Sequence, residues 1–291
     1  MLGFKTNNLK KAEQFYTNEH LNGNNQNYQK FILFSYRRSG TNFFLDLLRS
    51  HSDIVAYGGL YGDKLGYIYP GYPLHNNKSL IKFRDKNPTE FLDKYIYQDF
   101  TESIKAVGFK ITYEKAPIVL DHLHALPDLK IINLRRKNIF RMVLSNMIAV
   151  KTKKWHAIDA EYEKLTNDIK AVSRVRIIDE EKKNKSILPD DFNIHVDYDE
   201  CIKAMNVIKE YQDKYHDFFP KERTLVLYYE DILKDRELET GKALDFLGVE
   251  RKDLKTILKK INDKKLHEII SNYDELKIKF SGTEWAQFLD D

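Results

Sequence analysis

The chain has 291 residues, of which 42% are hydrophobic and 32% charged, and its 48 Lys and Arg against 44 Asp and Glu give a net charge of +4. This composition excludes a disordered chain, and so small a charge excess gives no reason to expect nucleic-acid binding. No stretch approaches the roughly 18 apolar residues of a membrane-spanning helix, and no apolar core of signal-peptide length starts the chain. The single cysteine, Cys201, lacks a disulfide partner and metal-ligand spacing. We expect a cytoplasmic globular protein without a metal; peripheral membrane contact and the oligomeric state stay open.

The first predicted strand follows a polar, Asn-rich segment, residues 1–29, which we expect to be irregular. Residues 31–36 form a compact apolar run that is too short for a helix and leads into the turn-prone residues 37–41. The apolar positions of residues 43–49 suit a helix that packs on a sheet. This pattern predicts a buried parallel strand, a tight turn and a helix.

The same strand-to-helix rhythm recurs along the chain. Residues 106–111 read as a strand followed by a helix through residues 118–126, residues 130–134 as a strand followed by a helix over about 139–150, and residues 224–229 as a last strand. The helix after that strand is expected to end near residue 247, before Gly248. Alternating strands and helices indicate one α/β domain over residues 30–291, with a mainly parallel sheet flanked by helices. Residues 57–100 and 151–199 break the rhythm and read as insertions.

The first strand end carries the pattern expected of an anion site. Parallel sheets bind ligands beyond the carboxyl ends of their strands. A glycine there allows a tight turn, the helix start offers free N–H groups, and arginines add charged donors. These features occur together in Arg37, Arg38, Ser39, Gly40, Thr41 and Asn42. The alternative is a pair of solvated arginines beside an ordinary turn. The pattern is not a Walker A loop, because the lysine of Gly-x-x-x-x-Gly-Lys-Ser/Thr is absent.

The string Arg-Ser-Gly-Thr-Asn between a strand and a helix resembles the 5′-phosphosulfate loop of sulfotransferases that use 3′-phosphoadenosine 5′-phosphosulfate (PAPS). A second similar landmark is the strand at residues 131–134, followed by Arg136 and by Ser145 on the next helix, which the resemblance implies bind the donor 3′-phosphate. Arg135 is an alternative to Arg136, and Ser145 could instead bond its own helix backbone. The resemblance implies a P-loop-like fold.

The likeness is nearest to bacterial sulfotransferases of the lipopolysaccharide and nodulation-factor kind and covers about residues 30–290. It extends to residues 152–156 and to a C-terminal segment at residues 271–275 and 282–283. The strings at residues 227–231 and 246–249 also match, and we interpret them as fold signatures. The donor is expected to bind without an obligatory cation, since His122 and His124 are two apart and would point to different faces of a helix.

The catalytic residues implied by the resemblance are Arg38, in place of the loop lysine or arginine, and Lys110, at the end of a strand. Lys110 is equally well explained as a solvent-exposed lysine. Related bacterial enzymes carry a glutamate base where this chain has Gly59. The candidates that replace it are Asp63, the nearest along the chain, and His51, His75 and Glu114.

The paired motifs predict transfer of a sulfuryl group from PAPS to a hydroxyl, and the Tyr-rich residues 57–97 suit a carbohydrate or glycolipid acceptor. The alternative, motivated by Gly59, is a catalytically impaired protein that binds PAPS or its product, 3′-phosphoadenosine 5′-phosphate (PAP). A nucleotide kinase is disfavoured by the missing Walker lysine.

Overall fold

The computed structural model describes residues 23–62, 65, 78–153, 157–158, 188–189, 191–256, 258–259 and 264–290. A five-stranded, wholly parallel sheet forms its centre, in the order β2-β3-β1-β4-β6. The strands are β1 (Gln29–Ser35), β2 (Ile54–Gly59), β3 (Ala106–Thr112), β4 (Lys130–Arg135) and β6 (Thr224–Tyr228). β1 lies in the middle, and the chain adds β3 on one side of it and β4 on the other. The carboxyl ends of β1 and β4 therefore flank the point where the strand order reverses, which is where α/β sheets bind ligands.

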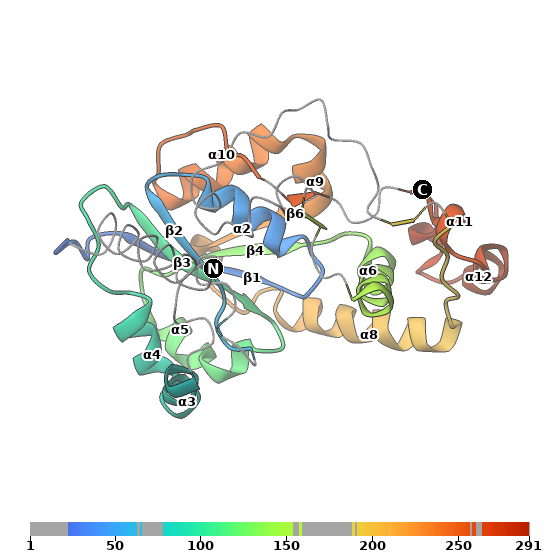
Figure 1. The fold of residues 1–291 in the computed structure, drawn as a ribbon, viewed down its shortest axis with the longest axis horizontal. Coiled ribbons are helices and arrows are strands. Elements are labelled where there is room, and N and C mark those ends of the chain that lie inside the picture. Colours follow the sequence, from blue (N-terminus) through green and yellow to red (C-terminus); the bar gives the residue numbers. More distant parts are fainter. Residues whose placement is uncertain are drawn as a thin grey trace, which may run out of the picture.

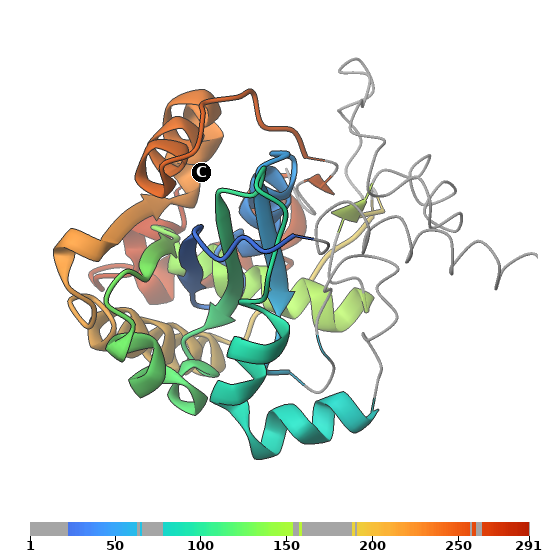
Figure 2. The ribbon, with the colours of Figure 1, turned by 90° about the vertical axis from the view of Figure 1, so that its left-hand side faces the viewer.

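Helices cover both faces of the sheet, as Figures 1 and 2 show. One face carries α2 (Thr41–Arg49), α9 (Tyr229–Lys234) and α10 (Arg236–Leu247). The other side of the molecule holds α3 (Lys78–Lys86), α4 (Pro88–Tyr95), the 3₁₀ turn Ala116–Ile118, α5 (Leu120–Ala125), α6 (Ile139–Thr152) and α8 (Tyr198–Lys214). Smaller elements are a two-stranded ribbon of β5 (Ala157–Ile158) and β7 (Leu258–Lys259), the helices α11 (Leu266–Ile269) and α12 (Tyr273–Phe280), and 3₁₀ turns at Lys221–Arg223 and Ala286–Phe288.

The core has one apolar cluster on each face of the sheet, and β1 contributes to both. Phe31 and Leu33 pack with α2 and α10, whereas Ile32 and Phe34 pack with the helices of the other face. All four side chains are fully buried. A strand that is buried on both faces has no polar alternation, and this explains why it reads as a continuous apolar run.

The predicted fold class is confirmed, and so are the four predicted strands and the helices after them, with boundaries that differ by one or two residues at most of their ends. Gly248 ends α10 in the left-handed conformation, with φ 70°. The second predicted helix, over residues 118–126, is shorter than expected, because it divides into a 3₁₀ turn and α5. β2 was not predicted, and its last residues fall in the stretch read as an insertion. Residues 1–22 and most of 151–199 lie outside the described residues. No helix in the described ranges has the length and apolar character needed to span a membrane.

Candidate functional site

The loop between β1 and α2 is shaped by two left-handed residues, Arg38 (φ 66°) and Gly40 (φ 81°). Gly40 is the N-cap of α2, and its carbonyl accepts the N–H of Phe44 at 3.0 Å. A Cβ at Gly40 would lie 2.1 Å from a ring carbon of Tyr229, so only glycine fits there. The first N–H groups of α2 have no carbonyl within their own helix, and they therefore point beyond the strand end. This arrangement is a general anion site.

Two hydroxyls line the inside of this loop. The Thr41 hydroxyl lies 2.7 Å from that of Ser35 in a buried hydrogen bond. The Ser39 side chain is fully buried, and within the described part of the chain its Oγ has no hydrogen-bond partner. Buried hydroxyls are nearly always paired, so Ser39 is a donor suited to an anion oxygen.

The second strand end is hydrogen-bonded to the first. The Arg38 guanidinium donates to Ser145 Oγ on α6 from Nε at 3.1 Å and from Nη2 at 2.8 Å. Arg136, directly after β4, donates from Nη1 to the Arg38 carbonyl at 3.1 Å. The structure thus brings Arg38, Arg136 and Ser145 together, although Arg38 and Ser145 are 107 residues apart in the chain.

Arg136 is held between aromatic and acidic neighbours. Its guanidinium lies 4.9 Å from the centre of the Tyr229 ring, and its Nε lies 3.8 Å from Glu230 Oε1, too far for a hydrogen bond. Burial lowers the pKa of Arg136; burial also lowers that of Arg38, and the nearby Arg136 charge lowers it further. Two partly buried cations side by side destabilise each other, and an anion between them would relieve this repulsion.

Glu230 fixes the turn from which Arg136 projects. Its carboxylate accepts the backbone N–H of Lys137 at 2.9 Å and of Asn138 at 3.2 Å. Asn138 in turn caps α6, accepting the N–H of Arg141 at 2.8 Å. The string at residues 227–231, which sequence reasoning took for a fold signature, therefore positions Arg136 through Tyr229 and Glu230. The available signal was that Tyr229 and Glu230 lie at the carboxyl end of the last predicted strand.

Two other arginines near these turns have their guanidinium groups engaged elsewhere. Arg135 is buried and donates from Nη2 to the Gln212 carbonyl of α8 at 2.9 Å. Arg37 donates from Nε to Glu114 at 2.6 Å. In the structure Arg136 rather than Arg135 lies beside Arg38 and Ser145, while Arg37 is paired with Glu114.

Lys110 reaches the start of α2 from the neighbouring strand. Its ammonium group donates to the side-chain oxygen of Asn42, in the first turn of α2. Burial, together with the nearby positive charges of Arg49 and Arg38, lowers the pKa of Lys110 to about 8. Gly59 is its register partner on β2, and a Cβ there would lie 3.5 Å from Lys110 Cε. Lys110 is therefore a partly buried amine beside the anion loop and not a solvent-exposed lysine.

The candidate bases fall in different places. Asp63 and His75 lie outside the described residues. Glu114 is paired with Arg37. His51 precedes β2 at the amino edge of the sheet, where its ring bonds the Glu250 carbonyl and the Asp53 N–H.

The groups that converge on the two strand ends fit the doubly phosphorylated donor that the resemblance implies. Ser39 Oγ and Arg136 Nε are buried polar atoms without hydrogen-bond partners among the described residues, and both can donate to phosphate oxygens. No set of three or more His, Cys, Asp or Glu side chains suited to a metal ion occurs in the described ranges.

Several known proteins are similar to this chain. Nodulation protein H of Rhizobium meliloti is 22% identical over 268 residues, which cover 89% of this chain and 94% of that protein. The same protein from strain 1021 is 22% identical over 267 residues, covering 90% and 95%. A solved sulfotransferase from Alicyclobacillus acidocaldarius is 16% identical with a TM-score of 0.44, covering 90% of this chain and 94% of that one. A mouse sulfotransferase in complex with PAP is 12% identical with a TM-score of 0.37, covering 92% and 89%.

The family model of the sulfotransferase domain matches residues 28–289, which include the whole sheet, both strand-end turns and the helices that cover them. The chain therefore belongs to the sulfotransferase family, the enzymes that transfer a sulfuryl group from PAPS to an acceptor.

Proposed function

We propose that this sulfotransferase sulfates a hydroxyl of a carbohydrate or glycolipid, with PAPS held between the carboxyl ends of β1 and β4. In this proposal the 5′-phosphosulfate binds at residues 37–42, and Arg136 and Ser145 hold the 3′-phosphate. The observation that carries the proposal is the direct bonding of the two turns: Arg38 donates to Ser145 and Arg136 donates to Arg38. One ligand with two phosphate groups can therefore contact both turns at once.

The proposed chemistry is an in-line transfer. The acceptor oxygen attacks sulfur, the bond from sulfur to the phosphate oxygen breaks, and the departing phosphate takes up the negative charge. Preorganised cations and N–H groups lower the free energy of such a transition state. Arg38 and Lys110 are the catalytic residues of this proposal, and Asp63 is the carboxylate nearest in sequence to the position of the missing glutamate. No metal ion is part of it.

The acceptor class rests on two features. The likeness to Nodulation protein H spans nearly the whole chain, and the Tyr-rich residues 57–97 include aromatic side chains of the kind that pack on sugars. The single cysteine, buried and without a disulfide, fits the reducing cytoplasm as the place of action. The proposal involves no nucleic acid, and it leaves peripheral membrane contact and the oligomeric state open.

The test is transfer of radiolabelled sulfate from PAPS to a panel of mono-, oligo- and glycolipid saccharides, with PAP affinity measured in parallel by calorimetry. The proposal expects PAP to bind and at least one saccharide to become labelled. Labelling of phenols or steroids but no saccharide would contradict the acceptor class, and absence of PAP binding would contradict the donor site.

A second candidate is a donor-binding protein with impaired catalysis, which the bare Gly59 favours. It predicts PAP binding without transfer to any acceptor, both in the natural chain and in Gly59→Glu. Transfer by the natural chain would exclude it.

A further inference from the structure

Gly59 places no side chain over Lys110, its register partner on the neighbouring strand. The backbone does not require a glycine at this position. A Cβ at Gly59 would make an ordinary contact of 3.5 Å with Lys110 Cε. At Gly40 and Gly108, in contrast, a Cβ would lie 2.1 Å from Tyr229 and 2.3 Å from the Phe31 carbonyl, so those two glycines are required by packing. Gly59 also has no positive φ. Its effect is therefore local: no side chain at position 59 covers Lys110 from β2.

Asn42 orients that amine. Lys110 donates one N–H to the Asn42 side-chain oxygen, in the helix turn where the proposed function places the phosphosulfate. A neutral amine has two N–H bonds and one lone pair. With one N–H directed at Asn42, the lone pair is left to point toward the β2 side or into the donor site.

The charged groups that act on Lys110 within the described residues are both cationic. They are Arg49, at the end of α2, and Arg38, in the loop. Together with burial they keep the pKa of Lys110 near 8. At that value about a tenth of the protein carries a neutral lysine at pH 7 and about half at pH 8. An amine in this range is suited to accept a proton at physiological pH.

We propose that Lys110, uncovered by Gly59, is the general base that takes the proton of the acceptor hydroxyl. This inference rests on the proposed function and replaces Asp63 as the base. As the acceptor oxygen bonds to sulfur, its proton moves to the Lys110 lone pair, and the bond from sulfur to the phosphate oxygen breaks with its electron pair on the phosphate. The ammonium formed in this way then lies beside the departing phosphate and stabilises its charge.

The negative donor raises the pKa of Lys110 when it binds. The pH dependence of kcat/KM reports the free enzyme and that of kcat the bound complex. We therefore expect kcat/KM to rise with pH up to about 8. We expect kcat to rise with pH over a range that lies above that of kcat/KM.

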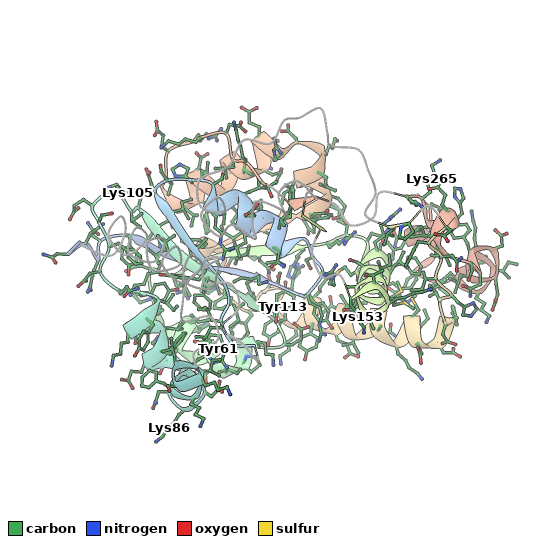
Figure 3. All side chains as sticks on the ribbon, in the orientation of Figure 1. Tyr61, Lys86, Lys105, Tyr113, Lys153 and Lys265 are labelled. Atoms are coloured by element: carbon green, nitrogen blue, oxygen red, sulfur yellow. The ribbon has the colours of Figure 1, made fainter. Side chains whose placement is uncertain are left out.

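The decisive comparison is Lys110→Arg against Lys110→Met. Arginine keeps the positive charge but gives up no proton in this range, so both variants should lose roughly 100-fold or more in rate. Rates are measured with the saccharide acceptor and also as labelled sulfate released from PAPS to water. Lys105→Met, at the residue just before the same strand (Figure 3), is the control and should keep the natural rate. An active Lys110→Arg enzyme overturns the proposal, as does a kcat/KM that falls through pH 8.

A rescue experiment covers the case in which arginine disturbs folding at position 110. The double variant Gly59→Glu with Lys110→Met places a carboxylate base beside the position of the lost amine. The double variant should be at least tenfold faster than Lys110→Met alone. The pH at which its kcat/KM rises should also be lower than in the natural enzyme. No recovery while PAP still binds, or a rise of kcat/KM with pH that disappears in Asp63→Asn, overturns the assignment to Lys110. Absence of both PAP binding and transfer in the natural enzyme would instead overturn the proposed function itself.

Discussion

Gly40→Ala tests whether the loop between β1 and α2 is held in one shape by Tyr229. The new methyl group would lie 2.1 Å from a ring carbon of Tyr229, on a residue whose φ is 81°. Gly248, which ends α10, has a similar φ of 70°, but a methyl group there would meet no atom within 4 Å. Gly248→Ala therefore isolates the backbone cost from the packing cost.

The expected free energies follow from these two terms. A left-handed alanine costs about 1–2 kcal/mol, and overpacking a rigid site adds about 1–3 kcal/mol. Gly248→Ala should therefore lower the free energy of unfolding by about 1–2 kcal/mol and Gly40→Ala by about 2–5 kcal/mol. Because the α2 N–H groups must move to admit the methyl group, Gly40→Ala should also weaken PAP binding, whereas Gly248→Ala should not.

Urea unfolding with linear extrapolation measures the first effect, and calorimetric titration with PAP measures the second. In a double-mutant cycle, Tyr229→Ala should recover much of the packing cost of Gly40→Ala, because the two sites are in contact. Equal destabilisation by Gly40→Ala and Gly248→Ala, or additive effects of Gly40→Ala and Tyr229→Ala, would show that Tyr229 does not hold the loop in one shape.

Three further predictions concern charged groups. Arg136→Ala should weaken PAP binding by roughly 1.5–3 kcal/mol, about 10- to 150-fold in Kd. In the same calorimetric titration, the affinity for the 3′-dephospho analogue should hardly change. Equal losses of affinity for both ligands would show that Arg136 does not bind the 3′-phosphate. Arg38→Ala should lower kcat for sulfate transfer more than it lowers PAP affinity, since Arg136 and Ser145 remain to bind the nucleotide, and a variant with unchanged kcat would count against a catalytic Arg38. Burial lowers the pKa of His51 below its unfolded value near 6.5, so the unfolded chain binds the extra proton first and stability should decline as pH falls below about 6.5. Urea unfolding at pH 7.5 and 5.5 should show a smaller decline in His51→Gln, and an identical decline would contradict this role.

The sequence was most informative where short segments determine their own structure. The run at β1 is apolar on both faces because both faces are buried, and the turn that follows contains the glycine that its φ requires. These features can be read locally, and for this reason the sheet and the loop at residues 37–42 were predicted with nearly correct boundaries.

Contacts between distant segments were harder to predict. β2 ends in two glycines, which are typical of a loop, yet the strand pairs with β3 along its length, up to Gly59 opposite Lys110. Arg37 and Arg38 are adjacent and chemically alike, but Glu114, 77 residues away, pairs with only the first of them. The left-handed φ of Arg38 sends its side chain to Ser145 instead. Which arginine faces the site depends on these partners and not on the motif.

The role of Tyr229 and Glu230 was missed for the same reason. Both follow β6, and neither belongs to the two landmark turns in the sequence. Only the order of the sheet, with β6 beside β4, brings them to Arg136. A residue that follows a strand neighbouring a predicted site is therefore worth treating as a candidate for that site.

In the proposed site, the turns after β1 and β4 hold opposite phosphates of one nucleotide. A crystal structure of the protein with PAP tests it most directly. We expect the 5′-phosphate at the first turn of α2, within hydrogen-bond reach of Ser39 and Thr41, and the 3′-phosphate against Arg136 and Ser145. A nucleotide bound at any other edge of the sheet, or with its 3′-phosphate in solvent, would contradict it.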